Sequence, residues 1–152
     1  LLLGGWNLTG ILTLQTGYPF SVGSGVDNAR SGTGGQRAEL TGNPLLPEGR
    51  PRGERINQWL NRAAFAPNAL GTFGTLGRNT FRGPGTATAD LGLHKNFPIA
   101  ERLTTQFRFE VFNAFNRVNL NLPDGNLASG NFQRITSAGD PRILQFALRV
   151  MW

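Results

Sequence analysis

Residues 143–152 read ILQFALRVMW, and in this stretch every second position from Leu144 to Trp152 is apolar. The positions between them include Gln145 and Arg149, so an extended chain here has one apolar side and one mixed side. Alternation with period two over this length predicts a β-strand with one apolar face.

Three other segments alternate in the same way, at about residues 6–16, 87–97 and 103–115. In the second of these, Lys95 interrupts the apolar face. Strands of globular proteins usually have about 5–6 residues, whereas a strand that crosses a bilayer at a tilt needs about 9–11. The length of all four segments therefore favours membrane-spanning strands over a soluble sheet.

The connections between these segments alternate between short and long. We predict a tight hairpin at residues 98–101, whereas the connections at residues 17–86 and 116–142 are long and rich in Gly, Pro, Asn and Thr. Outer-membrane barrels combine short turns at one end with long extracellular loops at the other. We therefore predict an all-β fold: four strands of an antiparallel transmembrane β-barrel, with long extracellular loops.

Composition excludes several classes of function. The chain has 152 residues, no Cys and one His, which excludes disulfide frameworks, Cys-based zinc sites, thiol nucleophiles and multi-His metal sites. Its apolar runs fall far short of the roughly 18 residues of a transmembrane helix. The sequence begins with Leu1 rather than Met, and we expect it to be a fragment or a processed product.

The formal net charge of +6 is concentrated in the loops. Residues 17–86 hold eight Arg and four acidic residues. A basic excess that does not follow one strand or helix face is poor evidence for nucleic-acid binding, and we expect no nucleic-acid partner. It suits loops that meet anionic groups. Within this loop, helical spacing of apolar side chains predicts a short helix over residues 55–65, and turns elsewhere.

Several motifs carry a family resemblance. The terminal residues Phe146, Leu148, Val150 and Trp152 look like the C-terminal signal that the barrel assembly machinery reads in bacterial outer-membrane proteins. Residues 109–119, FEVFNAFNRVN, resemble the penultimate-strand motif of TonB-dependent receptors, without the Tyr that usually follows. With GWNLTGI at residues 5–11, LGRN at 76–79 and RGPG at 82–85, the order of motifs resembles the C-terminal end of Oar-like TonB-dependent receptors of the acidobacterial type.

The resemblance implies a barrel of about 22 strands in the bacterial outer membrane, of which residues 1–152 supply the last four. It implies a plug and a TonB-contacting segment upstream, contact with outer-membrane lipid and lipopolysaccharide, and uptake of a small ligand. We interpret the chain accordingly as barrel wall, extracellular loops and assembly signal.

The first long loop contains the candidate ligand contacts. We expect Arg50, Arg52 and Arg55 to contact anionic groups and Trp59 to anchor the loop by packing. The same arginines could instead bridge lipopolysaccharide phosphates, and both interpretations stay open at this point.

Three charged residues on the polar faces of neighbouring strands, Asp90, Arg108 and Glu110, are candidates for a lumen-facing ion pair. A hairpin around residues 98–101 predicts antiparallel pairing with a residue sum of 198 or 200, which places Asp90 opposite Arg108 or Glu110. Such a pair would balance charge in the barrel wall.

We find no catalytic or metal site in the sequence, and we expect no enzyme and no cofactor. His94 has Asp90 nearby but lacks further ligands, so we interpret it as a polar lumenal residue. Asp27-Asn28 lacks the carboxylate spacing of a calcium loop and predicts a turn. The glycine-rich residues 30–35 lack the lysine and the strand-to-helix setting of a phosphate-binding loop.

Two alternatives differ in class. A trimeric autotransporter-like anchor would also have four strands per chain, although its heptad-patterned stalk is missing. A soluble secreted β-rich module would use residues 17–86 as a binding surface, although the long strands argue against it.

Overall fold

The computed structural model describes residues 4–152, which divide into two compact units. The strand unit contains the residues up to Gln15, residues 86–119 and residues 139–152. The loop unit contains residues 16–85 and 120–138. The two long connections predicted from the sequence therefore combine, over most of their length, into one body.

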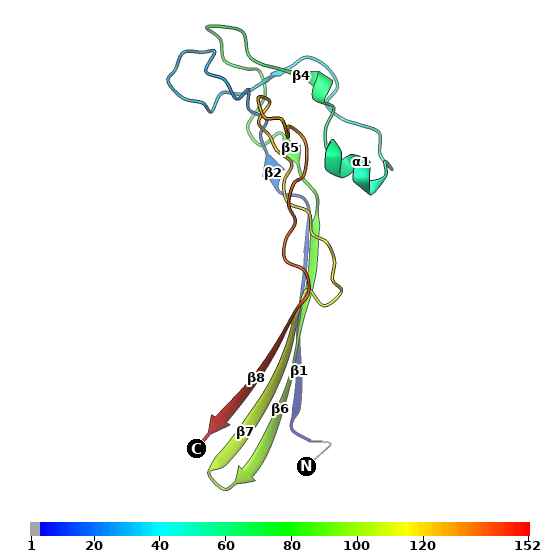
Figure 1. The fold of residues 1–152 in the computed structure, drawn as a ribbon, viewed down its shortest axis with the longest axis vertical. Coiled ribbons are helices and arrows are strands. Elements are labelled where there is room, and N and C mark those ends of the chain that lie inside the picture. Colours follow the sequence, from blue (N-terminus) through cyan, green and yellow to red (C-terminus); the bar gives the residue numbers. More distant parts are fainter. Residues whose placement is uncertain (1–3) are drawn as a thin grey trace. The chain divides into compact units, whose positions relative to one another are not determined.

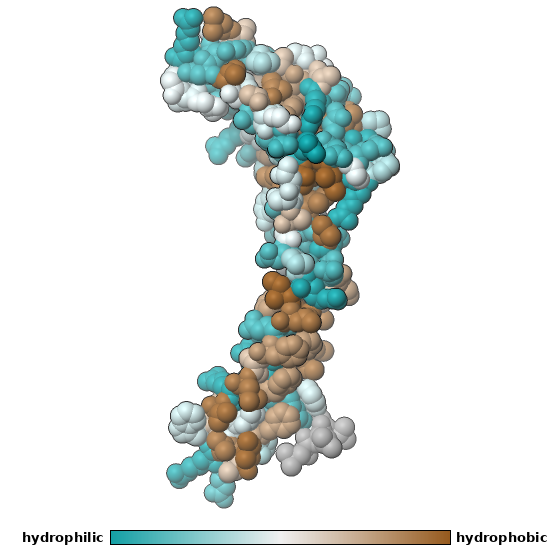
Figure 2. Space-filling model, viewed as in Figure 1, coloured by the Kyte–Doolittle hydropathy of each residue, from teal (hydrophilic) through white to brown (hydrophobic). Residues whose placement is uncertain are grey.

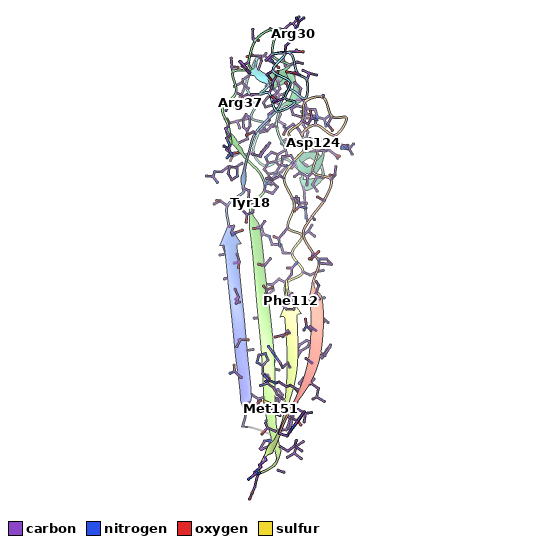
Figure 3. The ribbon with its side chains drawn as sticks, turned by 90° about the vertical axis from the view of Figure 1, so that its left-hand side faces the viewer. Tyr18, Arg30, Arg37, Phe112, Asp124 and Met151 are labelled. Carbon is purple, nitrogen blue, oxygen red and sulfur yellow. The ribbon has the colours of Figure 1, made fainter. Side chains whose placement is uncertain are left out.

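The strand unit is a four-stranded antiparallel sheet of β1 (Trp6–Gln15), β6 (Thr86–Ala100), β7 (Leu103–Phe112) and β8 (Ile143–Met151), in the order β1-β6-β7-β8 (Figure 1). The predicted antiparallel run of neighbours is confirmed. Both long connections leave one end of this sheet and the β6–β7 hairpin lies at the other, and Figure 3 shows Phe112 and Met151 toward opposite ends. In the described chain the sheet is open, because β1 and β8 each pair on one side only.

The register gives the sheet two chemically different faces. Leu93 of β6 pairs with Leu8 of β1 and with Phe109 of β7, which pairs with Phe146 of β8. Brown apolar side chains gather over these strands (Figure 2). They are unusually exposed: 75% for Leu8 and 66% for Phe146. An exposed apolar face of this extent needs a partner or a membrane to cover it.

Lys95 lies on this apolar face and is almost fully buried, at 1% exposure. Its ammonium nitrogen lies 4.9 Å from the ring centroid of Trp6 and 5.6 Å from that of Phe97, and it donates a hydrogen bond to the Gly4 carbonyl. Cation–π contacts and a carbonyl acceptor offset part of the cost of desolvating the charge. The lysine that interrupts the apolar pattern is thus accommodated by its aromatic neighbours.

The predicted β6–β7 register, with a residue sum of 198 or 200, is wrong. Residues from Leu91 to Pro98 pair with a residue sum of 202, so His94 lies opposite Arg108 and Gly92 opposite Glu110. The turn is at Glu101 and Arg102, nearer to β7 than predicted, and the register shifts between Pro98 and Ala100. Pro98 has no N–H for a regular ladder, which favours an irregularity here. Ala100 pairs with Leu103, a sum of 203, and the shift brings the sum to 202 from Pro98 onward. An even sum pairs residues of the same face, so the apolar residues of both strands lie on one side.

The predicted strand at residues 103–115 ends as β7 at Phe112, because Asn113 adopts a positive φ of 49°. The Asn113 backbone N–H donates to Asp90 Oδ1 at 2.9 Å, and its side-chain amide donates to the carbonyls of Arg117 and Asp140. Asparagine tolerates left-handed backbone and bonds locally, which suits it to end a strand. This part of the Asn-rich motif is therefore a strand terminator.

The loop unit contains four two-residue strands and two short helices. They are β2 (Pro19–Phe20), β3 (Glu39–Leu40), α1 (Arg52–Asn57), the 3-10 helix η1 (Arg62–Ala64), β4 (Phe65–Ala66) and β5 (Phe81–Arg82). β2 pairs with β5 and β3 with β4. Among residues 4–152, no helix has the length and apolarity needed to cross a bilayer.

A small aromatic core holds this unit together. Phe65 packs edge-to-face against Phe81 and against Phe132, with ring centroids 5.6 Å apart in both pairs. Phe132 belongs to residues 120–138, so the core joins the two segments of the unit. The prediction of irregular turns over most of residues 17–86 therefore missed a packed body.

The single helix predicted over residues 55–65 is also wrong. α1 ends at Asn57 and Gln58 is extended, after which the Trp59 N–H donates to the Gln133 carbonyl at 2.9 Å. Asn61 then caps η1 by accepting from the N–H of Ala63. The tertiary contact at Trp59 and burial of Leu60 in the core outweigh local helix propensity.

Candidate functional site

The loop unit contains an open cleft of about 600 Å³. It is lined by three segments of the chain, residues 45–50, residues in and after α1, and residues 80–82. Its size falls within the roughly 300–1,000 Å³ range of small-molecule sites. The lining combines apolar side chains with three arginines and a single carboxylate, that of Glu48.

Trp59 forms one side of the cleft and is held at both ends. Its indole Nε1–H donates to the Arg82 carbonyl at 2.9 Å, and its backbone N–H donates to Gln133. The indole is half-buried against the aromatic core. These contacts place Trp59 in the wall of the cleft, and its role as a packing anchor of the loop stays a prediction.

Arg55, from α1, lies over the Trp59 ring, with its guanidinium carbon 5.2 Å from the ring centroid. The side chain is exposed. Stacking on an indole keeps the charge and orients the planar group without using its N–H donors. Arg55 is therefore a cation positioned in advance at the cleft.

Arg50 has a different bonding pattern. Its guanidinium donates to the carbonyls of Pro47 at 3.3 Å, Gln58 at 3.0 Å and Trp59 at 3.3 Å. These bonds connect the turn at residues 47–50 to the chain after α1. Arg50 thus holds the cleft wall with three of the five N–H groups of an arginine.

The cleft brings together three of the four predicted ligand-loop residues, Arg50, Arg55 and Trp59. Arg52 does not line it. Arg82, which sequence reasoning missed, lines it and donates from Nη1 to the Gly17 carbonyl at 3.1 Å. The sequence did mark Arg82, which follows the apolar Phe81 and begins the RGPG motif. Its distance in the chain from residues 50–59 gave no sign that it lies in the same cleft.

The predicted charged group on the polar face of the sheet is only partly brought together. Arg108 Nη2 lies 2.8 Å from Glu110 Oε1, two residues along β7, and His94 Nε2 lies 3.7 Å from the same oxygen. Asp90 does not oppose either residue; it accepts from the Asn113 N–H instead. This correction follows from the register shift at the hairpin.

Asp27 organises a separate turn in the loop unit. The backbone N–H of Ser31 donates to Asp27 Oδ1 at 3.0 Å and that of Gly32 to Oδ2 at 2.8 Å, and Gln36 donates to Oδ1. The bond from Ser31 is the largest of the effects that lower the pKa of Asp27 below 3.8. Because N–H donors surround the carboxylate, it is placed to stabilise a turn. Within residues 4–152, no cluster of three His, Asp or Glu side chains could hold a metal ion.

The residues of the predicted assembly signal follow the alternation of β8. Phe146, Leu148 and Val150 lie on the apolar face and are exposed, and Trp152 follows the end of the strand at 93% exposure. The Phe146 ring stacks on Phe109 with centroids 4.8 Å apart.

A family model described as an outer membrane beta barrel domain matches residues 1–145. The chain belongs to this family. Searches of curated proteins and of solved structures found no match. In an outer-membrane barrel domain the apolar face of the strands lies against lipid and the polar face toward the interior. This assignment accounts for the exposed apolar face, and it argues against the soluble-module alternative.

Proposed function

We propose that this outer-membrane barrel domain is the C-terminal part of a TonB-dependent receptor, and that its loop unit captures a ligand for uptake. The observation that carries the proposal is that the long connections form a folded body with its own core and an arginine-lined cleft. A loop that only joins strands needs neither feature, and long ordered loops in barrels are usually functional.

The topology supports an outward-facing role for this unit. Both long connections leave the same end of the sheet, while the opposite end has only a tight hairpin. Outer-membrane barrels keep short turns on the periplasmic side and long loops outside. In this orientation the loop unit faces the medium, which supplies the ligand, on the side of the membrane that carries lipopolysaccharide.

The proposed receptor has about 22 strands, and the unpaired edges of β1 and β8 join further strands of that barrel. A plug and a TonB-contacting segment belong to the upstream part of the same protein, and the terminal residues of β8 serve the assembly machinery. The order of motifs in residues 5–142 supports this type of receptor over other barrels.

Binding of TonB tests the receptor type without knowledge of the ligand. The full-length protein, purified in detergent, should bind the isolated periplasmic domain of TonB, and should elute with the mass of one barrel per chain by light scattering. Absence of TonB binding would refute the receptor type. A mass of three chains per barrel would favour the trimeric anchor instead, for which the four strands per chain are the supporting observation.

A further inference from the structure

The cleft of the loop unit carries more positive than negative charge, and its arginines are not equivalent. Arg50 is bonded to three carbonyl groups and Arg82 to one. Among the described residues, the guanidinium of Arg55 has the Trp59 ring as its partner and no hydrogen-bond acceptor. An exposed guanidinium oriented in this way presents its donors to an incoming anion.

Apolar surface surrounds this charge. Leu45, Leu46, Leu60 and Phe81 line the same cleft, and Phe81 and Leu60 are buried in the aromatic core behind it. An inorganic anion would gain nothing from such walls, whereas a compound with an apolar body would gain from burying it. Charge and walls together describe an amphiphilic ligand.

We propose that the cleft binds a small molecule with a carboxylate, sulfonate or phosphate group on an apolar body, and that Arg55 contacts the anionic group. The inference rests on the ligand-capturing role proposed above for the loop unit. It assigns different roles to the predicted arginines: Arg55 recognises the anion, Arg50 holds the wall, and Arg52 has no part in the cleft. The bond to the Arg82 carbonyl fixes the indole of Trp59, on which Arg55 stacks. Arg55 is therefore already ordered, and binding costs little further side-chain entropy.

A pair of fluorescent probes tests this directly. The full-length protein in phosphatidylcholine nanodiscs is titrated with 8-anilino-1-naphthalenesulfonate and with N-phenyl-1-naphthylamine, which has the same rings without the sulfonate. Arg55→Gln should weaken binding of the sulfonate probe about tenfold, as loss of a charged hydrogen bond predicts. Binding of the neutral probe should change by less than about twofold, as for an ordinary surface substitution.

Arg52→Gln is the matched control, because it removes the same charge from the same helix at a position outside the cleft. It should leave both probes unaffected. Equal weakening by Arg52→Gln and Arg55→Gln would mean that only the general positive field attracts the probe, and the proposal would be wrong. Arg55→Lys guards against misfolding of the Gln variant, since it keeps the charge and should bind between the wild type and Arg55→Gln.

Two further measurements distinguish this inference from lipopolysaccharide binding and from the proposed receptor type. Lipopolysaccharide added to the nanodisc bilayer should not displace the sulfonate probe; displacement would assign the arginines to lipid phosphates and refute a diffusible ligand. The same preparations are tested for binding of the TonB periplasmic domain. If the wild-type protein binds TonB but has no probe site that depends on Arg55, this inference alone is wrong. If it has that probe site but does not bind TonB, the receptor type alone is wrong.

Discussion

Phe65→Ala tests whether the loop unit is an independently folded body. The Phe65 side chain is 7% exposed and contacts Phe81 and Phe132 edge-to-face, so it joins residues 16–85 to residues 120–138. Truncation of a buried Phe to Ala costs about 3–5 kcal/mol. Small domains are stable by about 5–15 kcal/mol in total. The substitution should therefore remove much of the stability of the loop unit.

Hydrogen exchange of the full-length protein in detergent measures this effect locally. The N–H of Gly23 donates to the Gly125 carbonyl at 2.8 Å and that of Trp59 to the Gln133 carbonyl at 2.9 Å. Both bonds join the two segments of the unit, so their amides should lose protection by about 100-fold or more, the equivalent of about 3 kcal/mol. Amides in the β6–β7 ladder should keep theirs, because they belong to the strand unit.

Phe73→Ala provides the control. It removes the same ring from the same unit, but at a position that is 73% exposed. The change in stability should stay within about 0.5 kcal/mol. If Phe65→Ala and Phe73→Ala lose protection equally, or if Phe65→Ala also opens the sheet, the loop unit has no separate core and the reasoning fails.

Three further predictions concern other positions. Gly17→Ala would place a Cβ 1.7 Å from the Gly83 carbonyl oxygen and should destabilise the loop unit by about 1–3 kcal/mol, whereas Gly34→Ala, in open space, should be neutral by hydrogen exchange. Trp152→Asp should reduce heat-modifiable, folded protein in the outer membrane; unchanged amounts would mean that the terminal aromatic is not read during assembly. Because the folded pKa of Asp27 is lowered, its hydrogen bonds should stabilise the turn at neutral pH and be lost as pH falls below 3.8 toward that lower pKa, which hydrogen exchange of the turn amides at stepwise lower pH would detect.

The strands were predictable because each carries its own signal. Alternation over ten or so residues is a local property, and a strand with one apolar face is the structure that satisfies it. The end of β7 was harder to predict. Residues 113–115 continue an aromatic-rich pattern, but Asn113 turns the backbone and its side chain donates to the carbonyls of Arg117 and Asp140. Those acceptors are brought near by the fold.

The sequence pattern could not predict which charged residues of β6 and β7 lie opposite each other. The turn at residues 101–102 and the irregularity after Pro98 change the β6–β7 register from the predicted residue sum of 198 or 200 to 202, so that His94 and not Asp90 lies opposite Arg108. Periodicity decides which face a residue occupies, and both registers keep the same faces. Only the geometry of the turn decides which residue lies opposite.

The sequence by itself determined the strand segments, their apolar faces, the antiparallel order and the excess of arginine in the loops, because these follow from local periodicity, connection length and composition. Tertiary structure alone decided that the loops form one body with a core and a cleft. Phe65 and Phe132 are too far apart in the chain for any local pattern to relate them, and the cost in entropy of bringing them together is offset only when the whole core packs. That same packing ends α1 before Trp59, sets Arg55 over its ring and brings Arg82 to the cleft.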